Sequence, residues 1–218
     1  MNVNTGYLLL KTDKKITESA TKLRGYIGRQ FQDNLILHNH ENQDLIYSYP
    51  LVQYKIIENN AILYGLEEGL STIKEISSDI NELKLTNTYQ IKEKILYEKE
   101  FELEESNKLH QYQFVTPWIA LNQKNYQKYK KISNQKECKI FLNKILIGNI
   151  LSMAKSFGIM VEKRLIVKSF LNITDVTYKS VVLKAFTGEF QTNFKLPDYM
   201  GLGKGVSHGY GTIINNKI

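Results

Sequence analysis

A chain of 218 residues with 42% hydrophobic content can bury one large core or two small ones, and two compact domains of about a hundred residues each are expected. Cys138 is the only cysteine, which excludes an internal disulfide and, with no signal peptide at the N-terminus, predicts a cytoplasmic protein. No apolar run approaches the roughly 20 residues that a membrane-spanning helix needs, so no membrane partner is expected.

The net charge of +7 is divided unevenly along the chain. Residues 1–121 contain 13 basic and 17 acidic side chains, for a net charge of −4, whereas residues 122–218 contain 16 and 5, for +11. This division favours an anionic partner for the C-terminal half. A merely soluble, lysine-rich surface is the alternative, while a membrane-surface protein is disfavoured because the charges do not gather on one amphipathic helix with a bulky aromatic face.

The first half of the chain predicts a regular succession of elements. In order, these are a strand over 6–12, a helix over 17–32 with Thr17 as its cap, a hairpin of 46–57 and 61–66 turning at Asn59 and Asn60, a helix over about 67–78, and extended segments between 83 and 103. The order βαββαβ predicts a ferredoxin-like domain over residues 1–108.

The second half predicts a modified copy of the same α+β unit over residues 109–218. A charged and polar join, residues 104–111, precedes it and contains His110, which is expected at the surface. The expected elements are a strand over 112–121, a helix over 135–157 with Ile140, Phe141, Ile145, Leu146, Asn149, Ile150 and Met153 near one side, two strands over about 163–174 and 177–192 turning near Asp175, and a last strand near 209–215. A glycine-rich loop stands where the second helix of the unit belongs, so the fold class is tandem ferredoxin-like.

The glycine-rich loop, GLGKGVSHGYG, suggests contact with a polyanion. Its residues of interest are Gly201, Gly203, Lys204, Gly205, Ser207, His208, Gly209 and Gly211. A backbone without Cβ atoms can take positive φ and lie directly against a partner, and the lysine, serine and histidine side chains suit phosphate groups.

His38 and His40, in LHNHE, are the leading candidates for catalysis. They lie two positions apart, so they should point to the same side of an extended segment, where both could reach one phosphate. Imidazole titrates near neutral pH and serves as general acid or base. A solvated turn without function is one alternative. A metal site is another, with Glu41 and Asp44 as the nearby candidates for a third ligand.

Tyr47, Tyr49 and Lys55 follow in an alternating run that places all three on one face of a regular strand. They are further candidates for the catalytic group, with half-buried strand aromatics and a plain surface charge as the alternatives. Tyr26, in the first helix, is another candidate.

Basic side chains form two groups. One group, on or beside the first helix, consists of Lys22, Arg24 and Arg29. An arginine there could bind a phosphate through two hydrogen bonds at once, and solvated helix charges are the alternative. The denser group consists of Lys128, Lys130, Lys131, Lys136, Lys139 and Lys144, interleaved with Tyr126 and Tyr129. It fits a phosphate-binding face, although a solvated helix and loop would look similar.

The spacing GxGxxxxxGxG, matched by Gly201, Gly203, Gly209 and Gly211, resembles the repeat-associated RNA-binding proteins of CRISPR systems. The segments LRGYIGRQF, LHNH, YSYPLVQYK and LYGLEEG resemble the subtype b branch of the Cas six repeat endoribonucleases. This resemblance implies that the protein cuts the repeat of precursor CRISPR RNA without a metal or other cofactor. The adjacent 2′-hydroxyl would attack the phosphate and leave a 5′-hydroxyl and a 2′,3′-cyclic phosphate.

The resemblance also implies roles and partners. His38 and His40 are expected as the acid and base, with Arg24, Arg29 and the glycine-rich loop on the RNA. Better-described members use a Tyr, a His and a Lys together, but the spacing of Tyr47, Tyr49 and Lys55 does not map onto that trio. Other members often carry Arg or Lys where His208 stands, and a histidine there would be mostly neutral at pH 7.

The expected partners are CRISPR repeat RNA, a second copy in a homodimer and subunits of a CRISPR effector complex. A non-catalytic RNA-binding subunit of such a complex and an HxH metalloenzyme are the alternative functions.

Overall fold

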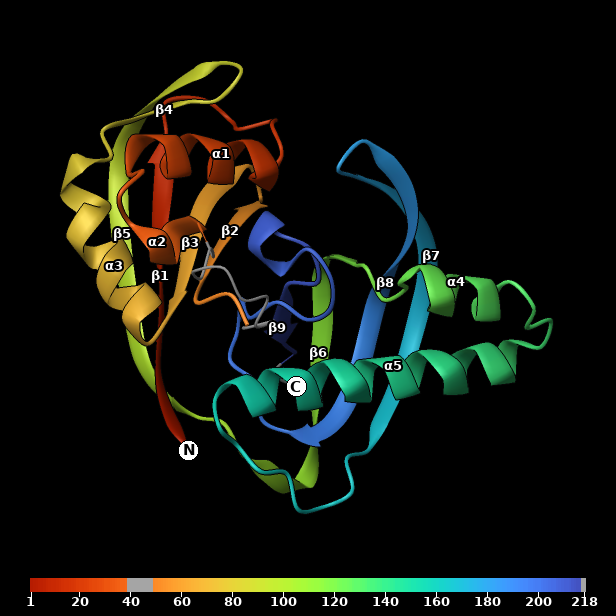
Figure 1. The fold of residues 1–218 in the computed structure, drawn as a ribbon. Helices are drawn as coiled ribbons and strands as arrows, with labels where there is room; N and C mark the ends of the chain where they lie inside the picture. The colour runs from red at the N-terminus through yellow and green to blue at the C-terminus, as the bar shows by residue number, and fades with distance from the viewer. Residues whose placement is uncertain (39–48, 217–218) are drawn as a thin grey trace. The chain divides into compact units, whose positions relative to one another are not determined.

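The chain forms two compact units in a computed structural model that describes residues 1–38 and 49–216, without the side chain of His38. The first unit consists of residues 2–101 together with residues 206–209. The second contains residue 1 and the stretches 102–205 and 210–216. Figure 1 shows the sheet and helices of each unit. The tip of the glycine-rich loop therefore belongs to the unit built by the N-terminal half.

The first unit has the predicted order βαββαβ with two short additions, α2 and β4. Its elements are β1 (Asn2–Thr12), α1 (Ala20–Gln30), α2 (Leu35–His38), β2 (Val52–Ile57), β3 (Asn60–Leu66), α3 (Glu68–Ile76), a 3₁₀ turn (Ser77–Asp79), β4 (Glu82–Lys84) and β5 (Thr88–Glu102). The sheet order is β2-β3-β1-β5-β4, so β2 is an edge strand.

Helix α1 packs on this sheet through residues spaced one turn apart. Leu23 and Ile27 are fully buried and share one cluster with Leu8 and Leu10 of β1 and Leu63 of β3. Each such side chain contributes about 2 kcal/mol by leaving water, so this face fixes the position of the helix.

Two local predictions in the first unit are wrong. The N-cap of α1 is Ser19 rather than Thr17, because the amide of Ile16 donates to the carbonyl of Asn59 and holds the preceding segment outside the helix. The β2–β3 hairpin turns at Glu58 and Asn59, with φ of 50° and 62°, rather than at Asn59 and Asn60. Positive φ at both central residues is the type I′ turn, whose twist matches that of the flanking strands in a two-residue loop.

The second unit repeats the sheet of the first. Its elements are β6 (Glu105–Trp118), α4 (Gln123–Tyr129), α5 (Gln135–Ser156), β7 (Val167–Tyr178), β8 (Val181–Phe194) and β9 (Ile213–Asn215). The sheet order β7-β8-β6-β9 places the second, third, first and last strands of the unit side by side, as in the first unit. The tandem ferredoxin-like prediction is confirmed. Between β8 and β9, the described residues contain one 3₁₀ turn, η2 (Val206–His208), where the first unit has α3.

Three features of the second unit differ from the prediction. Most of the expected join, residues 104–111, lies in β6. The β7–β8 hairpin turns at Lys179 and Ser180, with φ of 50° and 63°. Asp175 instead lies within β7, where its carboxylate is 2.7 Å from the Lys184 ammonium. The reason is again the two-residue loop, whose twist determines the turn more strongly than a single aspartate does.

The long helix α5 is confirmed, but its apolar face is rotated from the expected one. Leu142, Leu146, Ile150 and Met153 are buried, whereas Ile140 is 47% exposed. Asn149 is on the inner side because it accepts a hydrogen bond from the Trp118 indole at 3.0 Å. Among the helices that the structure describes, α5 included, none is long and apolar enough to cross a membrane.

Candidate active site

The tip of the glycine-rich loop lies along β2, the edge strand of the first sheet. Gly209 has φ of +87°, and a Cβ atom there would stand 2.7 Å from the Ala20 Cβ and 2.9 Å from the Tyr54 carbonyl oxygen. Both separations are shorter than van der Waals contact, so only glycine lets the loop approach α1 and β2 this closely. The backbone contact expected for this glycine is therefore made with the protein's own chain.

His208, beside that glycine, is held by two side chains of α1. Its Nδ1 is 3.2 Å from the Thr21 Oγ1, and its Nε2 is 3.2 Å from the Arg24 Nη1. A guanidinium only donates hydrogen bonds, so Nε2 accepts and the ring proton lies on Nδ1, which donates to the threonine. The ring is therefore neutral in this arrangement. The positive charge at this position belongs to Arg24.

The contact between Arg24 and His208 is called the Arg24 corner below, and Tyr54 links it to the end of α2. Its side chain is fully buried, and its hydroxyl donates to the Leu37 carbonyl at 3.1 Å. Burial raises the pKa of Tyr54, while the nearby charge of Arg24 acts in the opposite direction. The hydrogen bond fixes the backbone immediately before His38, so α2 ends on the side of the sheet where Arg24 lies.

The histidine pair is only partly described. His38 is the last residue of α2 and thus has a helical backbone, not the extended one that was expected. The expected shared side of His38 and His40 assumed an extended segment, and the helical backbone at His38 removes that assumption at the first of the two residues. His40 and Tyr47, like the alternative metal ligands Glu41 and Asp44, lie outside the described residues. The catalytic pair stays a prediction.

Lys55 belongs to a second group, on the other face of β2. Its side chain is fully buried, and its Nζ donates to the Gln53 Oε1 at 3.0 Å, while the Gln53 Nε2 donates to the Tyr49 hydroxyl at 3.0 Å. Burial lowers the pKa of Lys55 to about 7. Tyr49 precedes β2, which begins at Val52, so its link to Lys55 runs through Gln53 rather than along one face of a regular strand as predicted. A plain surface charge at Lys55 is excluded by its burial.

Strand alternation separates the two groups. Tyr54 faces α1 and the core cluster, so its neighbours Gln53 and Lys55 face away from the helices. The structure thus joins Arg24 and His208 on one face, and joins Lys55 to Tyr49 on the other.

The remaining candidates on α1 lie apart from this corner. Arg29 is exposed in the last turn of α1, five positions beyond Arg24 and therefore on another side of the helix. The Lys22 ammonium donates to the Thr86 hydroxyl at 2.8 Å. The Tyr26 hydroxyl donates to the Glu82 carbonyl at 3.0 Å, so it points toward β4.

The glycine-rich loop is divided between the units. Ser207 lies in η2 with the first unit, while the second unit holds Gly201, Gly203, Lys204, Gly205 and Gly211. Gly203 has φ of +88°, and a Cβ atom there would lie 2.5 Å from the Trp118 Nε1, so this glycine too is required by packing. Lys204 is exposed, with its Nζ 5.4 Å from the centroid of the Tyr178 ring. Contact of these residues with RNA stays a prediction.

Two further features lie away from the Arg24 corner. His110 is half-buried in β6 rather than at the surface, its Nε2 has no hydrogen-bond partner among the described residues, and burial lowers its pKa.

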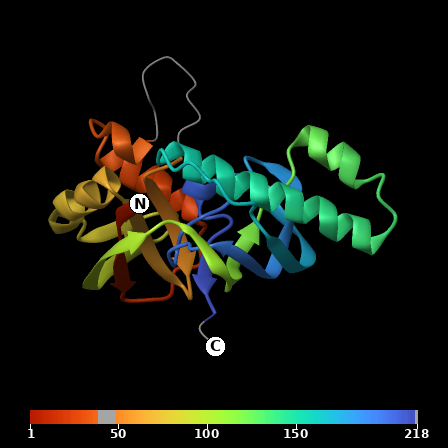
Figure 2. The same ribbon diagram turned by 90° about the horizontal axis from the view of Figure 1, so that it is seen from below.

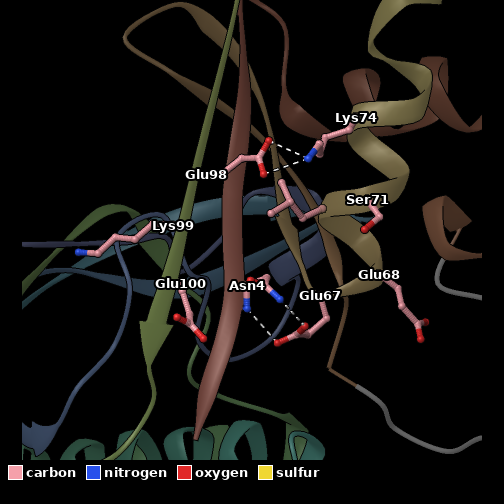
Figure 3. Close-up of a pocket in the computed structure, with 9 residues that line it drawn as sticks. Asn4, Glu67, Glu68, Ser71, Lys74, Glu98, Lys99 and Glu100 are labelled. Carbon is pink, nitrogen blue, oxygen red and sulfur yellow. Dashed lines mark hydrogen bonds and ion pairs between the residues drawn. The ribbon is translucent and has the colours of Figure 1, made fainter.

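A cavity of about 660 Å³ beside α3 and β5 contains four carboxylates, those of Glu67, Glu68, Glu98 and Glu100. Figure 3 shows Glu98 paired with Lys74 and Glu67 with Asn4. The excess of acidic groups makes this cavity unsuitable for a phosphate.

Three members of this region were missed from the sequence, namely Thr21, Gln53 and Tyr54. Thr21 lies three positions before Arg24 on α1, a spacing at which helical side chains are neighbours. Gln53 lies two positions before Lys55, but the full burial that makes it need hydrogen-bond partners is a property of the fold and not of the sequence.

Comparisons with known proteins agree over both units. The family model of the Cas6b N-terminal domain matches residues 1–102, and that of the Cas6b C-terminal domain matches residues 104–216. A solved structure described as "Crystal structure of Cas6b" is 35% identical, with a TM-score of 0.88 over 99% of this chain and 100% of that one.

Two further proteins are similar to this chain. "Crystal structure of CRISPR RNA processing endoribonuclease Cas6b" is 31% identical, with a TM-score of 0.79 and coverage of 99% and 100% of the two chains. An uncharacterized protein of Methanocaldococcus jannaschii is 40% identical over 149 residues, which are 67% of this chain and 96% of that protein.

Proposed function

The chain belongs to the Cas6b family of CRISPR RNA-processing endoribonucleases, and on that premise we propose that it cuts the CRISPR repeat by acid–base chemistry without a metal ion. The observation that carries this proposal is the corner at α1, where Arg24 touches His208 of the glycine-rich loop on the side of the sheet where α2 ends at His38. Cleavage at a phosphodiester requires a cation and two proton-transfer groups, and the proposal assigns these roles to Arg24 and to the two histidines.

The proposed reaction requires two proton transfers, one from the 2′-hydroxyl to a base and one from an acid to the leaving 5′-oxygen. A base removes the proton from the 2′-hydroxyl, and the resulting oxygen attacks the adjacent phosphorus. The bond from phosphorus to the 5′-oxygen breaks, and an acid protonates that oxygen. The products are a 2′,3′-cyclic phosphate and a 5′-hydroxyl, with no water consumed. His38 and His40 are assigned to the two proton transfers, each of which contributes typically 10²- to 10⁴-fold in rate.

Arg24 is assigned to the negative charge that develops on the phosphate. Its guanidinium can hold two phosphate oxygens at once, and its contact with the neutral ring of His208 fixes its direction. His208 is thus a positioning residue, which accounts for a histidine where related proteins often have a cation.

Lys55 is assigned to positioning and not to contact with the RNA. Its ammonium is fully buried against Gln53, so a phosphate does not reach it in this arrangement. Through Gln53 it orients Tyr49, which directly follows the segment that contains His40 and Tyr47. Tyr47 and Tyr49 remain candidates for contact with the substrate. The basic second half supplies further affinity for the RNA.

The first experiment measures cleavage of the host's repeat RNA in EDTA, with analysis of both new ends. We expect full activity in EDTA and a 2′,3′-cyclic phosphate on the upstream product. The double variant H38A/H40A should lose at least about 10³-fold in single-turnover rate. His110→Ala is the matched control, because this histidine lies in β6 of the second unit, and it should cut at the wild-type rate.

Several results would overturn the proposal. Wild-type cleavage by H38A/H40A would remove the histidines from the chemistry. Stoichiometric metal together with loss of activity on chelation would indicate a metalloenzyme. Tight binding of the repeat with no cleavage would indicate a non-catalytic subunit of an effector complex.

The second experiment isolates Arg24. Removing one donor to a developing oxyanion typically costs 10²- to 10³-fold, so R24A should lose about that much in single-turnover rate at saturating protein. R24K keeps the positive charge but loses the bidentate hydrogen bonding of a guanidinium, so it should recover only part of the cleavage rate. R29A, an exposed arginine on the same helix, is the control and should stay within about 2-fold of the wild type. Equal losses for R24A and R29A would mean a general charge effect.

A further inference from the structure

We propose that a groove between α5 and β7 of the second unit binds one unpaired nucleotide of the RNA, with the base on Phe170 and the phosphate on Lys136 and Lys139. This site is additional to the catalytic corner and rests on the proposed function, because it assumes an RNA substrate. The groove has a volume of about 710 Å³, within the range of small-ligand sites. Figure 2 shows α5 lying across the strands of this unit.

The walls of the groove come from two packed elements. α5 contributes Lys136 and Lys139, and β7 contributes Phe170 and Ile173, which are 67% and 53% exposed. The floor is fixed by a hydrogen bond of 2.6 Å from the buried Ser169 hydroxyl to the Asn143 side chain. The groove is therefore part of the folded unit and not a gap between mobile segments.

Its chemistry combines a flat apolar surface with positive charge. The Lys139 Nζ lies 3.9 Å from the centroid of the Phe170 ring. A base that stacks on this ring displaces the ammonium from the ring face toward the phosphate of the same nucleotide. Among the described residues, the groove is lined by two lysines and by no acidic residue, whereas the cavity of the first unit is lined by four carboxylates and two lysines. Charge complementarity thus favours an anionic occupant.

Unpaired RNA fits this surface better than duplex RNA or protein does. In an A-form duplex the bases are stacked inside the helix and cannot lie on an exposed phenylalanine, whereas unpaired bases can. Aromatic rings beside lysines are the usual platform for single strands. A purely apolar partner would leave the ammonium groups of Lys136 and Lys139 buried without counter-charges.

The test measures the affinity of a labelled 12-nucleotide oligouridylate and of the host's repeat RNA across a series of salt concentrations. F170A should weaken binding by about 5- to 150-fold, the cost of one lost base stack, without changing the salt dependence. K139Q and K136Q should each lower the slope of log affinity against log salt by about 0.7. F170Y keeps the ring and should bind like the wild type.

A matched control comes from the same unit. V182A removes an exposed apolar side chain of β8 that does not line the groove. It should bind like the wild type.

Cys138, the only cysteine of the chain, lines the groove and serves as a reporter. Saturating oligouridylate should slow its alkylation by iodoacetamide in the wild type and in V182A. At the same oligouridylate concentration, F170A should show less of this protection.

Three outcomes would overturn this inference: wild-type affinity of F170A, unchanged alkylation of Cys138 at saturating RNA, and a dimer in sedimentation that F170A dissociates. The last would assign the groove to a second copy of the chain. Failure of the proposed function is distinguishable, because it would appear as absent cleavage by the wild type at saturating protein, whatever the binding results are.

Discussion

Replacing Gly209 with alanine tests whether the tip of the glycine-rich loop is seated on the first unit. At φ of +87° an L-residue pays about 1–2 kcal/mol in backbone energy. The added Cβ would also overlap the Ala20 methyl group at 2.7 Å and the Tyr54 carbonyl oxygen at 2.9 Å, and such overpacking costs about 1–3 kcal/mol. The total of about 2–5 kcal/mol is comparable to the energy that holds a short loop in place.

The expected consequence is displacement of the neighbouring His208 from Arg24. The hydrogen bond of 3.2 Å between them cannot survive a shift of the backbone by an ångström or more. G209A should therefore show faster hydrogen exchange in residues 206–209 and in α1. It should also cut repeat RNA more slowly, with a loss approaching that of R24A.

Gly148→Ala is the matched control for this substitution. Gly148 lies inside α5, and among the described residues no atom beyond the neighbouring helix backbone stands within 4 Å of the position that its Cβ would take. Alanine there should stabilise the helix by about 0.5–1 kcal/mol and leave cleavage unchanged. If G209A matched the wild type in exchange, denaturant midpoint and cleavage, the loop tip would not be seated against β2 and the reasoning would fail.

Three further substitutions test packing and charge. Burial lowers the pKa of Lys55 to about 7 from 10.5, so between these pH values the native state binds fewer protons than the unfolded state and gains stability as the pH rises. K55M removes this titration and should therefore raise the free energy of unfolding most below pH 7, by up to about 5 kcal/mol in urea unfolding. This advantage over the wild type should vanish toward pH 10.5. A gap between K55M and wild type that does not change with pH would contradict this. Asn149→Ala removes the acceptor of the buried Trp118 indole and should cost about 1–3 kcal/mol, read from the fluorescence of this single tryptophan. K179N/S180G places Asn-Gly at the two positive-φ positions of the β7–β8 turn and should raise stability by about 1 kcal/mol; a lower melting temperature would refute the turn assignment.

Most of the secondary structure was predictable because it depends on neighbours in the chain. The apolar spacing of Leu23 and Ile27 in α1 reflects a helical period, and the alternation of β2 and β3 reflects a strand period. The errors occur where a distant contact competes with a local preference. Thr17 is a good capping residue, but the hydrogen bond from Ile16 to Asn59 moves the start of the helix to Ser19.

The candidate site was predictable in part. Arg24 and His208 were both identified as contacts for RNA, but nothing in either segment indicates that they touch each other. Lys55 was found as a candidate, yet its burial depends on residues packed around β2 and excludes only the alternative of a plain surface charge. Residue type therefore indicated the chemistry, while burial determined which groups are available for it.

The glycine-rich loop separates what a sequence pattern can predict from what only the tertiary structure determines. Its spacing is a local pattern that indicated the superfamily, while the order of elements predicted the tandem fold and the N-terminal segments indicated the family. That residues 206–209 belong to the first unit was not contained in the pattern, because His208 and Arg24 are 184 positions apart. A contact of that separation depends on the free energy of the whole folded chain, and only the tertiary structure could supply it.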